Sequence, residues 1–359
     1  MFIYWLLFAF PAVMALAYPV RLQRTGPSSA HGPAQGLAFL SFVVFYVLLG
    51  ALRFQTGGDW DTYDDTFNDI KVDTIAYAMT RTDPLYGVLN WLSAKADTGI
   101  YAVNGICCGL LGYGTVAAAI RLREPWLAVL IAVPYLLIVV GLGYVRQGAA
   151  IGLILIAIAN LDRSRPLRTI GFLVLATGFH SAAALALPVF AWALVKRNKV
   201  LAVFGTLVAA AIFVFVLAPR IGTFEQGYVE AEYDSGGATV RVMMGLLPSL
   251  LILARWRSFA ASPRVRSVWL LMALANVGAL VGLVLSPSST AVDRIALFFS
   301  VIQLAAFGEF RGLVGISERM VLITRLALIG VAAAVQMVWL VFGTHAVYWV
   351  PYKSVLQFL

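Results

Sequence analysis

The sequence predicts an all-α, polytopic integral membrane protein that forms a single transmembrane domain over residues 1–359. Hydrophobic residues make up 61% of the chain and charged residues only 12%, about half the charged fraction of a typical soluble domain. Apolar runs near the length of about 20 residues that a helix needs to cross a bilayer recur along the chain. We expect ten full spans, at residues 1–20, 36–52, 100–120, 126–141, 144–160, 200–218, 242–254, 268–285, 291–310 and 320–342.

The first run has no basic residue before its apolar core, and Arg21 and Arg24 follow it. This pattern favours an uncleaved span with an outer N-terminus over a signal peptide. With that start, 17 of the 26 Lys and Arg residues fall on the cytoplasmic side, in loops at residues 21–24, 121–123, 163–168, 196–199, 255–266 and 311–325. The basic excess therefore indicates topology, places both termini outside, and predicts no nucleic-acid partner.

An eleventh apolar stretch, between Thr169 and Val195, is interrupted by Gly178-Phe179-His180-Ser181. Basic residues flank it on both sides, so the positive-inside rule places both flanks in the cytoplasm, and a single crossing would violate this. We therefore expect a broken or re-entrant pair of helices that goes out and back, with His180 near its apex.

Two outer segments are long enough to form structure. Residues 55–99 contain eight Asp, and the stretch from Leu85 to Ala94 has the apolar spacing of a helix that lies on the bilayer surface. Residues 219–239 form a second acidic loop. We expect the two segments to cap an outward-facing cavity.

The first outer segment begins with Arg53 and continues through Gly57, Gly58, Asp59 and Tyr63. Glycines allow close backbone approach, while Arg supplies a donor fork and Asp an acceptor or base; a plain helix exit with solvated acids is the alternative. Asp59 and Asp61 are also spaced like a metal-binding pair of nucleotide-sugar enzymes. We expect no metal, because nucleotide sugars are cytoplasmic and this loop is predicted to be outside.

Arg146 and Gln147 begin the fifth span, where free helical amides and the helix dipole already favour anions. A guanidinium there could hold phosphate in a bidentate manner; snorkelling to lipid headgroups or pairing with an outer acid are the alternatives. Arg241 and Arg294 also lie at predicted outer ends, although Asp293 and Arg294 could simply neutralise each other. His31, His180 and His345 are too scattered for a clustered zinc site.

The ordered set of motifs resembles the EpsG type of Wzy-like polysaccharide polymerases. The resemblance is carried by Arg53, Gly58-Asp59, Tyr63, Phe67, Asp83-Pro84-Leu85-Tyr86, Tyr144-Val145-Arg146-Gln147, Phe179-His180-Ser181-Ala182-Ala183, Arg294 and Pro351-Tyr352-Lys353. It runs from about residue 50 to the C-terminus, and Asp83 stands where the family pattern leads us to expect Glu.

The resemblance implies an enzyme at the outer face of a bacterial inner membrane. It would transfer a growing glycan from undecaprenyl pyrophosphate to a lipid-linked repeat unit, without a cofactor. Membrane lipid, a chain-length regulator and a flippase are the other expected partners. The expected catalytic residues are His180, Asp59 and Arg146, and the expected substrate-binding residues are Arg53, Gly58, Tyr63, Gln147, Arg241, Arg294 and Tyr352.

The general base is either His180 or Asp59. We favour His180, because a neutral imidazole can accept a proton near pH 7, whereas we expect Asp59 to be tied to Arg53. Three other functions stay open: a polysaccharide ligase, a lipid-phosphate-sugar glycosyltransferase, and a transporter or flippase. The transporter is the weakest of these because no internal repeat is apparent in the sequence.

Overall fold

The computed structural model describes residues 1–18, 32–163, 165–195, 200, 237–259, 261–285 and 289–358. These residues form helices and connecting turns, and one isolated β-bridge joins Arg53 to Ser354. Six helical segments among them are long and apolar enough to cross a membrane: Pro33–Ala51, Gly99–Ala119, Pro125–Gly143, Ala238–Ser258, Pro263–Leu285 and Glu318–Phe342. Four shorter apolar helical segments accompany them. The chain is therefore an all-helical, multi-pass membrane protein.

Most predicted apolar runs are helices. They are α1 (Phe2–Ala17), α2 (Pro33–Ala51), α6 (Gly99–Ala119), α7 (Pro125–Ala132), α9 (Val145–Asp162), α14 (Ala238–Arg255), α15 (Pro263–Leu285) and α19 (Val321–Phe342). After α7 the helix continues as a π-helix, η1 (Val133–Val140), which begins beside Pro134. A short α-helical turn, α8 (Gly141–Gly143), completes this segment. A proline lacks the amide hydrogen that a regular turn needs, so the wider helix is a physical response to it. The run expected at 200–218 lies outside the described residues, except for Val200.

The predicted single helix at 291–310 is wrong. The segment divides into α16 (Ser289–Ala296), a turn over residues 297–301, α17 (Ile302–Gly308) and α18 (Phe310–Val314). Within the turn, the amides of Phe298, Phe299 and Ile302 bond to carbonyls three residues earlier rather than four. This tighter winding interrupts the α-helix without any glycine or proline to signal it.

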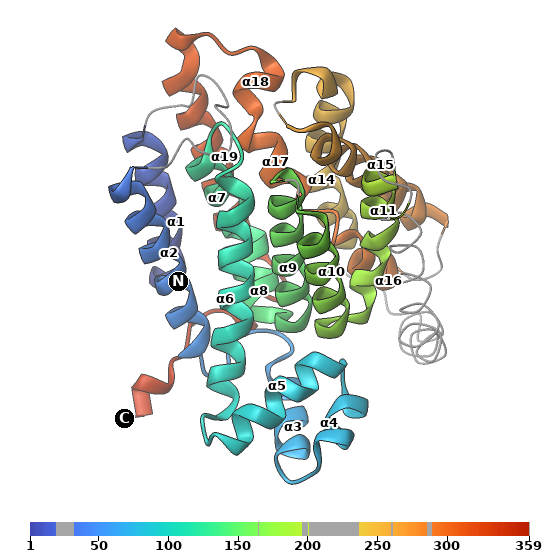
Figure 1. Ribbon diagram of the computed structural model, residues 1–359. Coiled ribbons are helices and arrows are strands. Elements are labelled where there is room, and N and C mark those ends of the chain that lie inside the picture. The colour runs from blue at the N-terminus through green and yellow to red at the C-terminus, as the bar shows by residue number, and fades with distance from the viewer. Residues whose placement is uncertain are drawn as a thin grey trace.

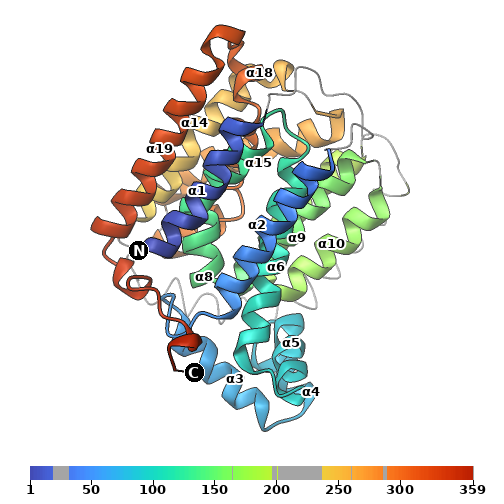
Figure 2. The same ribbon diagram turned by 90° about the vertical axis from the view of Figure 1, so that its left-hand side faces the viewer.

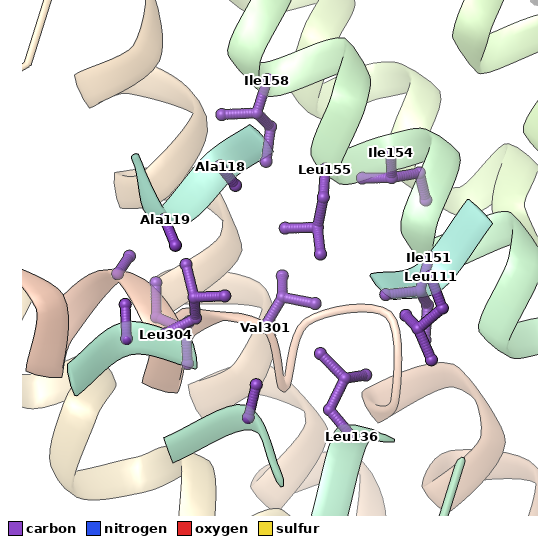
Figure 3. Packing of buried hydrophobic residues seen from close by; sticks show 14 of the residues in the cluster. Leu111, Ala118, Ala119, Leu136, Ile151, Ile154, Leu155, Ile158, Val301 and Leu304 are labelled. Atoms are coloured by element: carbon purple, nitrogen blue, oxygen red, sulfur yellow. The ribbon is translucent and has the colours of Figure 1, made fainter. Parts of the chain in front are cut away.

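Helix α9 lies at the centre of the molecule and packs mainly on α6 and α10 (Pro166–Phe179). Its residues from Ala149 to Leu161 are buried, as expected for a helix that is apolar on every side. Figure 3 shows Leu155 of α9 pointing towards Val301 of the turn, with Leu304 and Leu136 nearby. The turn at Val301 thus lies in the same core as α9, while α16 packs on α15 and α14 and α17 packs on α7 and α14.

Three short helices, α3 (Trp60–Lys71), α4 (Ile75–Arg81) and α5 (Pro84–Lys95), form a cap at one end of the bundle (Figure 1). Trp60, Tyr63, Phe67 and Ile70 form the buried face of α3 at helical spacing. The helix expected at 85–94 is present as α5, and its buried face carries Tyr86, Gly87, Asn90 and Ser93. We name this end of the molecule the cap end.

The C-terminal tail also reaches the cap end. Phe54 N–H donates to Lys353 O and Val355 N–H donates to Leu52 O, both at 2.9 Å, while the Tyr4 hydroxyl donates to Trp349 O at 2.8 Å. Figures 1 and 2 show the tail near the cap end, and Figure 2 shows α1 next to α19. The first helix and the tail are therefore joined, and the tail fixes the loop that begins at Arg53. The second expected loop, 219–239, lies outside the described residues apart from 237–239.

Candidate active site

The buried carboxylate of Asp83 joins three distant segments at the cap end. Asp83 is 2% exposed and precedes Pro84 at the start of α5. Its Oδ2 accepts a hydrogen bond from Arg146 Nη1 at 3.1 Å and lies 3.2 Å from His180 Nδ1. Its Oδ1 accepts the Ser181 N–H at 3.0 Å. One carboxylate thus positions an arginine of α9 and a histidine at the end of α10.

His180 lies at the break that the sequence predicts. Helix α10 ends at Phe179, His180 is extended with φ −155° and ψ 117°, and a 3₁₀ turn, η2 (Ser181–Ala186), leads into α11 (Leu187–Val195). In Figure 1, α10 runs towards the cap and α11 runs back from it. Gly178 makes the approach possible, since a Cβ there would lie 2.5 Å from Leu85 Cδ1 of α5.

The contact with Asp83 sets the role of each nitrogen of the His180 ring. If the Asp83 carboxylate accepts a proton from Nδ1, the neutral ring has Nε2 as its acceptor. The ring also stacks on Phe298 at a centroid distance of 5.9 Å and an interplanar angle of 21°. With its side chain 22% exposed, His180 is held in place yet can be reached by a substrate.

Arg146 lies in the first turn of α9, close to Tyr63 and Tyr86. Its Cζ is 5.6 Å and 5.8 Å from these two ring centroids, and Nη1 also donates to Thr82 Oγ1 at 3.0 Å. Pairing with an outer-segment acid, one of the alternatives considered for this arginine, is present as the Asp83 contact. The side chain is nevertheless 30% exposed, so part of it remains accessible to an anion.

Arg53 lies behind this cluster and is fully buried. It donates to the carbonyls of Thr56 and Leu142 and to Asn104 Oδ1, the last at 2.8 Å. The expected direct pairing of Arg53 with Asp59 is therefore wrong, because the guanidinium hydrogen bonds go to neutral acceptors, and Arg53 acts on the Asp59 carboxyl group only through its charge. Gly57 allows this arrangement: its φ is +108°, and a Cβ there would lie 2.3 Å from Leu142 O.

Asp59 precedes α3 and is partly buried, with Arg294, Arg146 and Arg53 close enough to act on its carboxyl group. Burial raises the pKa of Asp59 above its ordinary value, and the three arginines only partly offset this effect. Burial, together with Asp59, raises the pKa of Tyr63 to about 12. Tyr63 is therefore a neutral phenol at pH 7.

A second charged pair joins α14 to α16. Arg241 Nε donates to Asp293 Oδ1 at 2.9 Å and Arg241 Nη2 donates to Asp293 Oδ2 at 2.7 Å. The alternative that Asp293 neutralises Arg294 is therefore wrong, because both carboxylate oxygens bind Arg241. The Arg294 guanidinium instead lies 4.1 Å from the Tyr144 ring centroid. The backbone carbonyl of Arg294 accepts a hydrogen bond from Gln147 Nε2 at 2.7 Å.

Two of the expected site residues lie elsewhere at the cap end. Gly58 is exposed, and a Cβ there would make only ordinary contact with Trp349. The Tyr352 hydroxyl donates to Leu49 O at 2.8 Å, and its ring packs edge-on against Tyr4 at 6.0 Å. Tyr352 thus attaches the C-terminal tail to α2 and has no contact with the Asp83 cluster among the described residues.

Asp83 is a functional candidate that sequence reasoning named only within the family resemblance and did not assign to the site. It appears in the sequence as one of eight acids in an outer segment, and only the following proline marks it as the start of a helix. Nothing local shows that it is buried. Its role depends on α9 and α10 meeting α5, which is a tertiary event.

The fold and the site define a helical, multi-pass membrane protein with an arginine, histidine and carboxylate cluster at one end of its bundle. A family model described as the EpsG family matches residues 36–354. The chain belongs to the EpsG family, and the resemblance expected from its motifs is confirmed. Family membership supports a role in polysaccharide biosynthesis. No curated protein and no solved structure matches the chain significantly.

Proposed function

We propose that the protein is a glycosyltransferase that polymerises polysaccharide repeat units. It moves the growing glycan from undecaprenyl pyrophosphate to a hydroxyl of the next lipid-linked repeat unit. The observation that carries this proposal is the Asp83 carboxylate, which holds both Arg146 and His180. Arg146 suits a pyrophosphate leaving group, and His180 suits a hydroxyl nucleophile.

Arg146 is the first candidate for stabilising the leaving group. It combines a guanidinium fork with the first turn of α9, whose free amides also favour an anion. Hydrogen bonds to charged groups contribute about 1.5 to 3 kcal/mol each, and preorganised donors are most effective where charge develops in the transition state. Arg294 supplies a second cation close to Asp59.

His180 acts as the general base of the proposed reaction. Its Nε2 takes the proton of the acceptor hydroxyl while that oxygen forms a bond to the anomeric carbon of the donor glycan. The bond from this carbon to the pyrophosphate oxygen breaks, and its electron pair leaves with the lipid pyrophosphate. The imidazolium then returns its proton to water. Asp59 is the alternative base.

We place the cap end at the outer face of a bacterial inner membrane, with about ten membrane crossings, one of them through the broken 289–308 segment, and with both termini outside. The C-terminal tail lies at the cap end, and the arginines of several basic loops gather at the opposite end. There Arg123 pairs with Glu309, Arg325 pairs with Glu124, and Arg255 donates to the Leu313 carbonyl. A lipid-linked donor is the form of activated glycan that fits an outer site without nucleotides.

The competing functions differ in acceptor and in donor. A ligase would use the same leaving group with a different acceptor, and a lipid-phosphate-sugar transferase would add one sugar at a time. A transporter needs no general base for glycosyl transfer, and the internal repeat that often accompanies alternating access is not apparent in the sequence.

The size distribution of lipid-linked glycans separates these functions. It is measured in cells that lack the protein and in the same cells complemented with the wild type or with Arg146→Ala. Polymerase activity predicts that single repeat units accumulate on undecaprenyl pyrophosphate in the deletion and the Arg146→Ala cells, with long chains restored by the wild type. Long lipid-linked chains in the deletion cells would indicate a ligase, and truncated repeat units a one-sugar transferase.

A further inference from the structure

One oxygen atom of Asp83 serves two partners. Oδ2 is 3.1 Å from Arg146 Nη1 and 3.2 Å from His180 Nδ1, whereas Oδ1 is occupied by the Ser181 amide. Asp83 itself is 2% exposed, but the side chains of Arg146 and His180 are 30% and 22% exposed. A substrate therefore meets the arginine and the histidine first, with the shared carboxylate behind them.

A pyrophosphate that binds Arg146 competes with this carboxylate. Phosphate oxygens accept two parallel hydrogen bonds from a guanidinium, and Arg146 donates to Asp83 through Nη1 alone. The rings of Tyr63 and Tyr86 retain the guanidinium at its place through cation–π contact. Arg146 can thus exchange one acceptor for another without leaving the cluster.

We propose that Asp83 couples binding of the lipid pyrophosphate to preparation of His180 as the base, an inference that rests on the proposed function. Without donor, Asp83 Oδ2 divides its hydrogen bonding between Arg146 and His180. When the pyrophosphate takes Arg146, Oδ2 keeps the hydrogen bond from the Nδ1–H of His180 and no longer shares it with the guanidinium. A carboxylate that accepts from Nδ1 fixes the tautomer and the orientation of the imidazole, so Nε2 is held ready for the acceptor hydroxyl when the donor is in place.

Asp83 is a positioning residue in this scheme, because it touches neither the reacting carbon nor the pyrophosphate. The scheme predicts that removing the charge of Asp83 tightens binding of the lipid pyrophosphate and lowers turnover. Asp83→Asn keeps the size of the side chain but frees Arg146 from its anionic competitor. A residue that only supports the fold would, when changed, weaken binding and turnover together.

The test uses the full-length protein in lipid nanodiscs and two measurements. The first is equilibrium binding of undecaprenyl pyrophosphate without a glycan, and the second is turnover of the lipid-linked repeat unit. We expect Asp83→Asn to bind the lipid pyrophosphate about tenfold more tightly, equivalent to about 1.4 kcal/mol. We expect its turnover to fall on the order of a hundredfold, the lower range for loss of general base catalysis.

Asp69→Asn is the matched control. Asp69 accepts Arg81 Nε at 3.0 Å and Nη2 at 2.8 Å within the same cap, at an exposed position. The same chemical change there should alter neither measurement. Unchanged or weaker binding in Asp83→Asn would overturn the coupling while leaving the polymerase proposal intact. Failure of the wild type to bind undecaprenyl pyrophosphate would instead overturn the polymerase proposal.

Asp83→Glu keeps the inference testable if the Asn variant does not fold. The longer side chain retains the negative charge, and glutamate is the residue that the family resemblance leads us to expect here. Its affinity for the lipid pyrophosphate should stay close to that of the wild type, with turnover partly retained. Tighter binding, or turnover as low as that of His180→Ala, would contradict a role based on charge.

Discussion

The ring of His180 is fixed on two sides, by the Asp83 carboxylate at 3.2 Å from Nδ1 and by the Phe298 ring at 5.9 Å. Such restraint is unnecessary for a histidine that only fills space at a helix break. It is what a base needs, because one nitrogen must keep its proton while the other is presented to the substrate. At the residue scale, the orientation of the His180 ring therefore matters to the site as much as the presence of a histidine.

Replacing His180 tests this role directly. His180→Ala should lower polymer formation on the order of a hundredfold or more, the typical contribution of a positioned base, while the protein remains in the membrane. The measurement is polymer length and yield in complemented deletion cells, with protein quantified in membranes. His345→Ala is the control, because His345 is exposed and, among the described residues, its ring stacks on Tyr348 alone. Wild-type chain length in the His180 variant would exclude it as the base.

Arg146→Lys separates charge from geometry. Lysine keeps the positive charge but loses the planar fork that matches phosphate oxygens. We expect turnover to fall about tenfold or more, since each charge-assisted hydrogen bond contributes about 1.5 to 3 kcal/mol. Arg81→Lys, in the exposed Asp69 pair, should leave turnover unchanged. Near-normal activity of Arg146→Lys would refute bidentate phosphate binding.

Asp59 predicts a dependence of stability on pH. Because burial raises its pKa in the folded state, its contribution to stability is complete below the unfolded pKa and is lost as pH rises through the folded pKa. Asp59→Asn mimics the protonated form, so the variant should be more stable than the wild type at pH 7, on the order of 1 kcal/mol. Thermal unfolding between pH 4 and pH 8 should show this difference shrinking towards acid pH. A difference that grows towards acid pH would contradict the direction of the shift.

At the element scale, the site depends on how helices end and on where they can approach. The break at residues 178–181 could be predicted because two basic flanks forbid a single crossing. The break at residues 297–301 could not, because Leu297, Phe298 and Phe299 are ordinary helix-compatible residues in an apolar run. Val301 and Leu304 are buried in the same core as α9 (Figure 3), and α17 packs mainly on α7 and α14. Such long-range contacts are absent from local sequence.

Gly178 provides a test of the contact between α10 and α5. A side chain at this position meets Leu85, with the ideal Cβ 2.5 Å from Leu85 Cδ1. Gly178→Val should move α10 away from α5, separate His180 from Asp83, and lower polymer formation on the order of tenfold or more, since small misplacements of reacting groups have large effects on rate. Gly171→Val is the matched control in the same helix, because nothing lies within 4 Å of its Cβ position. Equal activity of the two variants would show that this approach does not matter.

For the whole molecule, composition and charge predict the helical membrane class, whereas the site required the fold. Asp83 lies 63 residues from Arg146 and 97 residues from His180, and their meeting depends on α5, α9 and α10 converging. The candidates Arg146 and His180 could be named from their motifs and from their places at helix ends. Arg53 is a buried anchor and Arg241 is the partner of Asp293. Both roles depend on tertiary contacts that the sequence around these arginines does not show.

The orientation of the bundle gives the last prediction. Several arginines at the end opposite the cap are paired with the acids Glu124, Glu309 and Glu318. Acidic residues contribute little to the positive-inside rule, so this pairing does not weaken the proposed orientation. The cap, with its acids, should therefore face outside, and the basic end should face the cytoplasm.

Single cysteines at the two ends test this orientation. Asp61 in α3 and Arg319 before α19 are both exposed, while the native Cys107 and Cys108 are buried and should contribute little background. In right-side-out spheroplasts, a membrane-impermeant maleimide should label Asp61→Cys at once and Arg319→Cys only after permeabilisation, with the wild type as the control for background. The reverse order would place the Asp83 cluster on the cytoplasmic side, where nucleotide sugars are available. A lipid pyrophosphate would then lose its advantage as the donor, because that advantage follows from the absence of nucleotides on the outer side.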